Sequence, residues 1–490
     1  MKKFFIFVFL LLTPLIFFTG CKKNELTKAS KNLTSYDMNL VLDFENKTLS
    51  GNEQVEYVNK TGSALGFICF NLYPSAFREG SSQSVVSGLN KNRCYPNGLS
   101  FGGIEILSCN GNNVSNFEIT GEDQNILKIN LKNALENNKS EKFLINFKIT
   151  IPNCNHRFGW SEDIINLGNF YPIACVFENG AFVENTYHFN GDPFYSECAN
   201  YTVSITTSKE LTAVGSGEGK IQQNGETKTT TFSTKAIRDF AIVVGKFENK
   251  STNVDRVTIN YYFYNDENAD LSLETAKKSI QTFNKLFGSY PYAIYNVVQT
   301  KFIQGGMEYP CLVMISDAIT GADYQNVIVH ETAHQWWYSL VGNNQIKNAW
   351  QDEALAEFST ALFYKYNPDY NIDFEKHFTN LKASYQVFEK VYTEVLKDLD
   401  KSISREINQF NTEPEYTYLT YVKGNLMFKA LYDSMGEKKF LNALQNYFKT
   451  YKFKIASPEN LISCFSKASG SDLTGFFNNW LSGNVNINEL

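Results

Sequence analysis

One segment of the sequence has residue types and spacing typical of a catalytic metal site: His330-Glu331-Thr332-Ala333-His334. Residues four apart share one face of a helix, so the two imidazoles can hold one metal ion. Glu331 lies about 100° further around the helix, where its carboxylate can act on a water molecule as a general base. Neutral imidazole is a preferred ligand of Zn²⁺, so the segment predicts one zinc ion per chain.

A catalytic zinc ion usually has three protein ligands and one open position, so a third ligand is needed. Eighteen residues separate His334 from Glu353, which lies at the start of the next predicted helix. That helix can pack antiparallel to the first and complete a His₂Glu set. Three other carboxylates compete for this role, namely Asp323, Asp352 and Glu357.

The spacing of the histidine motif and Glu353, with Gly305-Gly306-Met307-Glu308 upstream, resembles the signature of the M1 family of zinc aminopeptidases, which are gluzincins. The resemblance implies that the two histidines and Glu353 bind zinc. It implies that the glutamate of the histidine motif is the general base. It also implies that the upstream segment binds substrate, with Glu308 holding the free α-amino group of a peptide.

Elementary chemistry agrees with the roles implied for this upstream segment. Gly305 and Gly306 have no Cβ, so a peptide backbone can lie against them without a clash. The carboxylate of Glu308 can bind an α-ammonium group through charge-assisted hydrogen bonds. The family usually has Asn after this glutamate, whereas the present sequence has Tyr309, so the preferred N-terminal residue is not indicated.

Two tyrosines receive a role from the resemblance alone. Tyr421 lies three residues before Gly424 in a Tyr-x-Lys-Gly pattern, and the family match implies that its phenol stabilises the oxyanion. Tyr416, five residues earlier, matches a second active-site tyrosine of some members.

Segments 157–160 and 191–197 resemble parts of the family's amino-terminal domain that face the catalytic cleft. The family often supplies a second amine-binding residue from this domain, and Glu178 is the candidate here.

The elements that position these residues change in character along the chain. Residues 35–250 contain many short alternating segments, which predict an antiparallel β domain of sandwich-like or saddle-like form. Residues 251–490 are mostly helical, and the resemblance implies a thermolysin-like catalytic domain. The sequence predicts helices at 271–287, 324–341, 351–366, 375–399, 421–434, 437–450, 458–468 and 471–481. We therefore expect an α+β fold class, without the large carboxy-terminal helical domain of many M1 members.

The first residues are typical of a targeting segment. Two lysines precede an apolar run over 4–18, and Cys21 follows Gly20, which resembles the bacterial lipoprotein signal. We therefore expect a signal peptide at 1–20, a lipid on Cys21, a flexible tether over 21–34 and an exported protein anchored to the bacterial cell membrane. An uncut signal anchor is the alternative.

Composition limits the possible partners. The formal net charge is −6 and no basic block occurs, which argues against nucleic acid. The cysteines after Cys21 form no CxxC pair, so a thiolate zinc site is not indicated. These cysteines can form disulfides or remain as free buried thiols. The sequence does not indicate the oligomeric state.

These observations predict a zinc-dependent aminopeptidase that acts on peptides with a free N-terminus. Two alternatives remain open, a gluzincin endopeptidase and a catalytically silent surface lipoprotein that uses the fold for binding. Cleavage of amino-blocked peptides would distinguish the endopeptidase from the aminopeptidase. Intact Glu331 and Tyr421 argue against the second, because a silent protein has no chemical need of them.

Overall fold

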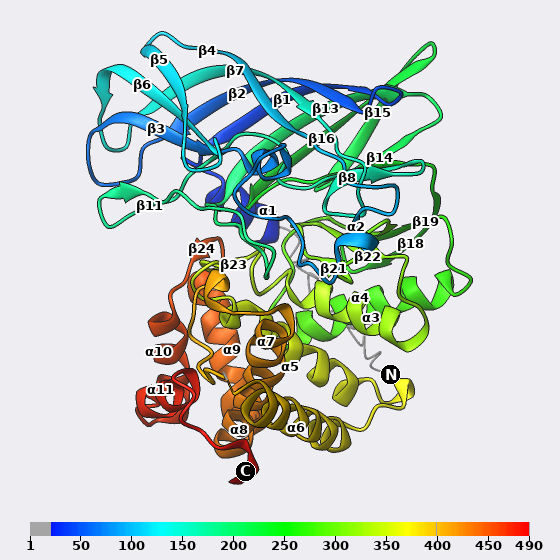
Figure 1. Cartoon of the computed structure of the whole chain (residues 1–490), viewed down its shortest axis with the longest axis vertical. Helices are drawn as coiled ribbons and strands as arrows, with labels where there is room; N and C mark the ends of the chain where they lie inside the picture. The colour runs from blue at the N-terminus through cyan, green and yellow to red at the C-terminus, as the bar shows by residue number, and fades with distance from the viewer. Residues whose placement is uncertain (1–20, 398, 490) are drawn as a thin grey trace, which may run out of the picture.

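The computed structural model describes residues 21–397 and 399–489, which form a β-rich half followed by a largely helical half (Figure 1). The predicted signal peptide at 1–20 lies outside the described residues. The predicted α+β class is confirmed, with β structure confined mostly to the amino-terminal half.

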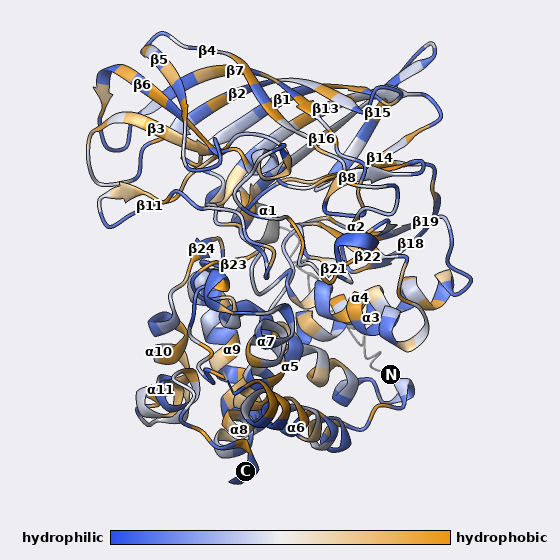
Figure 2. Ribbon diagram, in the orientation of Figure 1, coloured by the Kyte–Doolittle hydropathy of each residue, from blue (hydrophilic) through white to orange (hydrophobic). Residues whose placement is uncertain are grey.

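A seven-stranded sheet dominates the amino-terminal half. Its strand order is β15 (Glu218–Asn224), β16 (Thr227–Ile237), β13 (Ala199–Ser208), β1 (Ser35–Asp43), β2 (Thr48–Val58), β7 (Ser140–Thr150) and β4 (Gly103–Asn110). Buried and exposed residues alternate along β1, as a sheet with one covered face requires. Figure 2 shows the corresponding mixture of apolar and polar residues along these strands. The sheet is antiparallel except that β1 pairs with β13 in parallel, a departure from the predicted pattern.

Two smaller sheets and a ribbon accompany the large one. The first sheet contains β10 (Ile173–Ala174), β3 (Leu65–Asn71), β6 (Ile126–Leu135) and β5 (Val114–Thr120). The second contains β14 (Thr212–Gly215), β17 (Ile242–Gly245), β9 (Ile164–Leu167) and β8 (Phe158–Ser161). Strands β11 (Phe177–Glu178) and β12 (Ala181–Phe182) form the ribbon. Phe70 of β3 lies edge-on against Phe143 of β7, so the layers share an aromatic core.

A five-stranded sheet opens the second half. Its order is β18 (Glu248–Val254), β19 (Val257–Phe263), β20 (Ile294–Thr300), β22 (Leu312–Ser316) and β21 (Gly306–Met307). Strand β18 begins at Glu248 and pairs antiparallel with β19. Helix α3 (Ala269–Leu286) packs on this sheet and on helix α4 (Gly321–Ala333).

The remaining chain is helical and follows the predicted order. The helices are α5 (Trp350–Tyr366), α6 (Phe374–Lys390), α7 (Glu413–Thr417), α8 (Gly424–Met435), α9 (Glu437–Tyr451), α10 (Pro458–Ser469) and α11 (Thr474–Leu481). Short 3₁₀ helices occur at Tyr73–Phe77, Pro368–Tyr370, Ile407–Gln409 and Ile487–Glu489, and α2 spans Lys91–Cys94. Strands β23 (Val341–Gly342) and β24 (Lys454–Ile455) pair in parallel.

Several helix boundaries differ from the prediction, including the start of α11 at Thr474 rather than 471. The helix predicted at 324–341 ends at Ala333, because the chain turns after the second histidine. The helix predicted at 375–399 continues from α6 into a π-helical turn, Val391–Leu396, and ends at the left-handed residue Lys397. The helix predicted at 421–434 begins at Gly424, after a π-helical turn at Tyr418–Lys423.

The segment predicted as a flexible tether contains helix α1 (Cys21–Ala29). Leu26 packs partly buried against the core, and Glu25 forms an ion pair with Lys452 of the second half. No helix of the described residues is long and apolar enough to cross a membrane.

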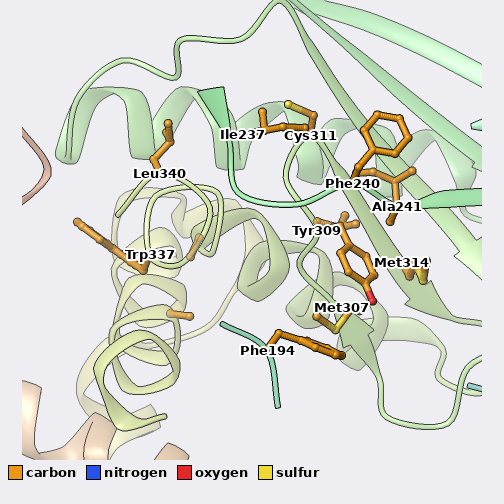
Figure 3. Close-up of a cluster of buried hydrophobic side chains, with 14 of the residues drawn as sticks. Phe194, Ile237, Phe240, Ala241, Met307, Tyr309, Cys311, Met314, Trp337 and Leu340 are labelled. Atoms are coloured by element: carbon orange, nitrogen blue, oxygen red, sulfur yellow. The ribbon is translucent and has the colours of Figure 1, made fainter. Parts of the chain in front are cut away.

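The two halves share a core. Figure 3 shows Phe194, Ile237 and Phe240 of the β half in one buried cluster with side chains of the second half, namely Met307, Tyr309, Cys311, Met314, Trp337 and Leu340. An apolar contact of this kind fixes the relative position of the halves. Residues of the β half can therefore contribute to a site in the second half.

Arg238 joins the halves by polar contacts. Its buried guanidinium donates to the carbonyl oxygens of Tyr338 (2.8 Å), Ser196 (2.6 Å) and Lys454 (2.9 Å). These three segments are far apart in the sequence, so one side chain satisfies buried backbone acceptors from both halves.

We predict that Arg238→Met destabilises the protein by about 3–5 kcal/mol, because three buried carbonyl groups lose their donor. The measurement is the urea midpoint followed by tryptophan fluorescence. Lys220→Met, at an exposed position on β15, is the control and leaves the midpoint in place. Equal midpoints for both variants would contradict the assigned role.

Candidate active site and metal centre

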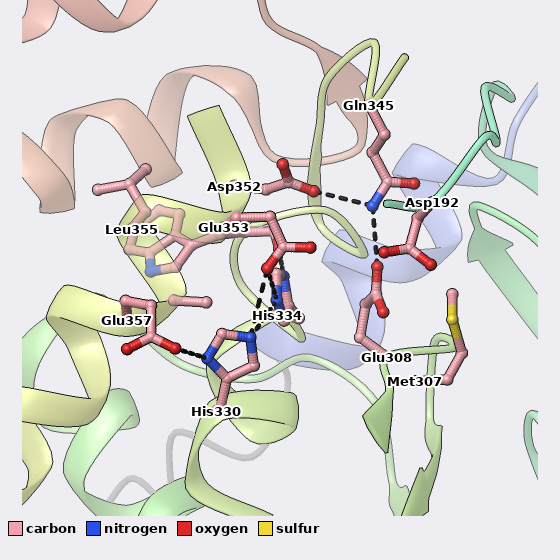
Figure 4. A network of polar contacts seen from close by, with 12 residues as sticks. Asp192, Met307, Glu308, His330, His334, Gln345, Asp352, Glu353, Leu355 and Glu357 are labelled. Carbon is pink, nitrogen blue, oxygen red and sulfur yellow. Dashed lines mark hydrogen bonds and ion pairs between the residues drawn. The ribbon is translucent and has the colours of Figure 1, made fainter. Parts of the chain in front are cut away.

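Helices α4 and α5 bring the three predicted zinc ligands together (Figure 4). The Nε2 atoms of His330 and His334 lie 3.1 Å apart. Oε2 of Glu353 lies 3.3 Å from the first and 3.2 Å from the second. All three side chains are buried, and their ligand atoms lie within 4.8 Å of one another. The spacing prediction is therefore matched by the geometry.

The donor chemistry of this group fits zinc. Two imidazole nitrogens and a carboxylate oxygen that face one buried point need a shared positive partner, and His₂Glu is a known catalytic zinc set. Burial alone would lower the pKa of His334, but the charge of Glu353 and its hydrogen bond raise that pKa to about 10. Conversely, the two imidazoles hold the pKa of Glu353 below its ordinary value, although burial opposes this. The field at this point thus favours a cation.

Outer contacts orient both imidazoles. Nδ1 of His334 lies 2.9 Å from the carbonyl oxygen of Trp337, and Nδ1 of His330 lies 3.1 Å from Oε1 of Glu357. Nδ1–H of His334 can therefore be donated away from the site, and the charge of Glu357 favours a proton on Nδ1 of His330, which leaves both Nε2 lone pairs facing the metal position. Glu357, considered above as a competing ligand, instead supports a ligand.

The other competing carboxylates face elsewhere. Asp352 accepts hydrogen bonds from Asn343 and Gln345, both at 2.9 Å. Asp323 is exposed in the first turn of α4, two turns before His330. Glu308, His334 and Asp352 form a second convergent group, but it shares His334 with the first.

Glu331 is buried beside the ligands and lines a cavity of about 270 Å³. Burial raises its pKa to about 7, which is suited to a group that both accepts and returns a proton. Its place depends on Gly306 of β21, because a Cβ there would lie 2.1 Å from Oε1 of Glu331. The second glycine of the predicted substrate segment therefore makes room for the predicted base.

Glu308 lines the same cavity and is also buried. Its Oε1 accepts a hydrogen bond of 2.8 Å from Gln345, which also donates to Asp352. Burial, followed by the neighbouring charge of Asp192, raises the pKa of Glu308 well above its ordinary value. A cationic group would compensate this carboxylate, as expected of an amine-binding residue. In the predicted substrate segment 305–308, Gly306 also lines the cavity. Met307 is instead buried in the shared core, where Arg157 contacts its sulfur.

The β half contributes Arg157 and Asp192 to the cavity. The two side chains form a buried ion pair, and Arg157 also lies 3.2 Å from the sulfur of Met307. Both belong to the segments, 157–160 and 191–197, that the family resemblance indicates as facing the cleft. The sequence indicated no role for Asp192 itself, although the resemblance of segment 191–197 indicated its region.

Glu178 is not among the residues that line the cavity. It lies in the β11–β12 ribbon, and its carboxylate accepts a hydrogen bond from Tyr195. The structure therefore does not bring it together with Glu308; Asp192 is the acidic residue of the β half that lies there.

Both predicted tyrosines reach the cavity. The ring of Tyr421 lies nearly parallel to that of His330 at 6.1 Å, and Tyr416 lies edge-on against Tyr421 at 5.7 Å. Residues five apart would point in different directions on a regular α-helix. The wider turn at Tyr418–Lys423 brings both side chains to one side. Gly424 lets this region approach α5, since a Cβ there would lie 2.6 Å from that of Ala354.

Tyr309, the departure from the family pattern, points away from the cavity. It is buried in the shared core, and its hydroxyl donates to Oδ1 of Asn169 at 2.7 Å (Figure 3). Gly168 accommodates it, because a Cβ at that position would lie 2.0 Å from the hydroxyl oxygen. Tyr309 therefore connects the substrate segment to the β half.

Comparisons with known proteins agree with this geometry. Residues 271–480 match the model of the Peptidase family M1 domain. Aminopeptidase 2 of Candida albicans is 26% identical over 59% of this chain and 33% of its own length. Aminopeptidase N of Lactococcus lactis is 25% identical over 43% of this chain and 26% of its own length. The chain thus spans a third or less of these curated relatives.

A solved structure shows the same fold over nearly the whole chain. The crystal structure of an M1 zinc metallopeptidase from Deinococcus radiodurans covers 93% of this chain and 95% of that chain, with a TM-score of 0.67 and 18% identity. The matched domain, the shared fold and the His₂Glu group together imply Zn²⁺ as the cofactor.

We predict that Gly306→Ala lowers kcat by about 100-fold or more, because the added Cβ displaces the carboxylate of Glu331. Zinc content measured by elemental analysis stays at one per chain. Gly475→Ala is the matched control, since a Cβ there meets nothing within 4 Å. Full activity of Gly306→Ala would show that the contact does not position Glu331.

We predict that Glu357→Ala weakens zinc binding by about 10–100-fold, because His330 loses the carboxylate that lies 3.1 Å from its Nδ1. Glu357→Gln retains an acceptor oxygen and largely restores the affinity. Competition with a chelator measures the zinc Kd of both variants. An unchanged Kd in Glu357→Ala would remove Glu357 from the metal site.

Proposed function

We propose that this chain is a zinc-dependent aminopeptidase that hydrolyses the N-terminal residue from peptides. One observation carries the proposal: the buried carboxylate of Glu308 lines the same cavity as the His330, His334 and Glu353 group. A peptide held by its free amine at this carboxylate would present its first peptide bond to the metal position.

His330, His334 and Glu353 would hold the zinc ion. When bound, this ion would act as a Lewis acid and lower the pKa of a coordinated water molecule. Glu331 accepts a proton from the attacking water at its carboxylate and returns it to the leaving amine. The phenol of Tyr421 donates to the carbonyl oxygen as negative charge develops there. Glu308 binds the ammonium group and fixes the length of the product at one residue.

The alternatives are less well supported. An endopeptidase would leave the buried Glu308 without a cationic partner, at a cost in binding. A silent binding protein would have no use for Glu331, whose room beside the ligands depends on the absence of a side chain at Gly306.

We also propose that the protein is exported and held at the bacterial membrane by a lipid on Cys21. The leader pattern supports this, with two lysines, an apolar run and a cysteine directly after Gly20. Peptides outside the cytoplasm would then be the substrates. Mass measurement of the membrane-extracted protein before and after lipase treatment distinguishes the lipid from an uncut signal anchor.

The test of the activity compares free and amino-blocked aminoacyl fluorogenic substrates. We predict cleavage of the free substrates, loss of cleavage with a chelator and its return with zinc. Glu308→Ala should reduce kcat/KM for free substrates by about 100-fold, because a buried charge-assisted contact is lost, while zinc content is unchanged. Glu459→Ala, at an exposed position on α10, is the control.

Equal cleavage of blocked and free substrates would exclude the aminopeptidase and support the endopeptidase. Absence of any cleavage by the zinc-loaded protein would support the binding protein.

A further inference from the structure

The cavity carries more negative charge than the proposed reaction needs. Among the described residues that line it, Arg157 is the only lysine or arginine. The lining carboxylates are Asp192, Glu308, Glu331, Glu353, Glu357 and Glu413. A zinc ion and the ammonium group of a peptide would not balance this set.

Most of these carboxylates already have an assigned partner. Asp192 pairs with Arg157, Glu308 would bind the ammonium group, and Glu357 faces Nδ1 of His330. Glu331 and Glu353 lie at the metal position. Glu413 is the carboxylate that has neither a cation nor a catalytic role.

Glu413 is nevertheless held in a fixed orientation. Oγ of Ser87 lies 2.5 Å from its Oε2, and Nδ2 of Asn90 lies 2.9 Å from each of its oxygens. These donors are neutral, so they orient the carboxylate without cancelling its charge. They also come from the β half, across the contact between the two halves.

Glu413 lines the same cavity as Glu308 and Asp192. The carboxylates of Glu308 and Asp192 lie close to each other (Figure 4). Next to Asp192, Gly191 approaches Tyr416 so closely that a Cβ would lie 2.4 Å from the tyrosine hydroxyl oxygen. Glu413 is three residues before Tyr416, hence nearly one turn along the same helix.

The hydroxyl of Tyr416 is a second feature of this cavity. The side chain is buried, lines the cavity, and its hydroxyl has no hydrogen-bond partner among the described residues. A buried hydroxyl of this kind needs a partner, which a polar side chain of a ligand can provide. The cavity therefore offers an oriented carboxylate and a hydroxyl without a partner among the described residues, in addition to the proposed amine site.

We propose that Glu413 selects peptides whose first residue has a long cationic side chain, arginine or lysine. This selection rests on the proposed aminopeptidase function. With the ammonium group at Glu308, the side chain of the first residue extends within the cavity toward Tyr416 and Glu413. A guanidinium or ammonium head would form charge-assisted hydrogen bonds with the carboxylate.

The test compares coumarin amides of arginine, citrulline and leucine. Citrulline has nearly the shape of arginine without the charge, so the arginyl-to-citrullyl ratio of kcat/KM reports the charge alone. We expect a ratio of about ten or more for the unmodified protein, a value near one for Glu413→Gln and an intermediate value for Glu413→Asp. Glu394→Gln, at an exposed position away from the cavity, is the control and keeps the ratio of the unmodified protein.

Ser87→Ala provides a second variant in case Glu413→Gln does not fold. It removes one donor to Glu413, and we expect it to lower the ratio by a few fold. A ratio near one in the unmodified protein, with leucyl substrate cleaved, would overturn the selection and leave the proposed function intact. A high ratio that Glu413→Gln leaves unchanged would also overturn it. Failure to cleave any aminoacyl substrate would instead overturn the proposed function on which the selection rests.

Discussion

The burial of carboxylates around one small cavity is the constraint on which the site depends. Asp192, Glu308, Glu331 and Glu353 are all buried, and an isolated buried carboxylate is strongly unfavourable. Each therefore needs a compensating group. Arg157 compensates Asp192, and two imidazoles with a zinc ion would compensate Glu353. The negative charge of Glu308 has no cationic partner among the described residues, so this carboxylate can bind a cationic amine.

This compensation requires both halves of the chain. Arg157 and Asp192 belong to the β half, while the metal ligands lie on α5, on α4 and directly after the end of α4. The apolar cluster of Figure 3 and the three hydrogen bonds of Arg238 hold these groups in register. A displacement between the halves would separate Asp192 from Glu308 and Glu413 from Ser87. The shared core is therefore as much a part of the site as the ligands are.

The sequence was most informative where the chemistry is local. A spacing of four residues on a helix determines that two imidazoles share a face, and the class of fold followed from the change between strand and helix periodicity. The turn after His334 and the π-helical turn before Gly424 were missed, because both depend on packing against α5 and the shared core. Glu413 shows the same limit. Whether a carboxylate reaches the cavity is decided by contacts between segments more than 100 residues apart, such as those of Glu413 with Ser87 and Asn90.

Two glycines of the sequence motifs are required by contacts with other segments rather than by their own backbone conformation. Gly306 lies beside Glu331, and Gly424 lies beside Ala354, the residue that follows Glu353; neither glycine has a positive φ angle. Their role is the absence of a side chain: one leaves room for the carboxylate of Glu331, and the other lets the turn bearing Tyr421 approach the helix of Glu353. A substitution at either position would add volume within van der Waals contact of α4 or α5, so it would disturb catalytic groups that are distant in sequence. These glycines thus connect the substrate segment and the tyrosine segment to the same pair of helices, and the three motifs form one steric unit.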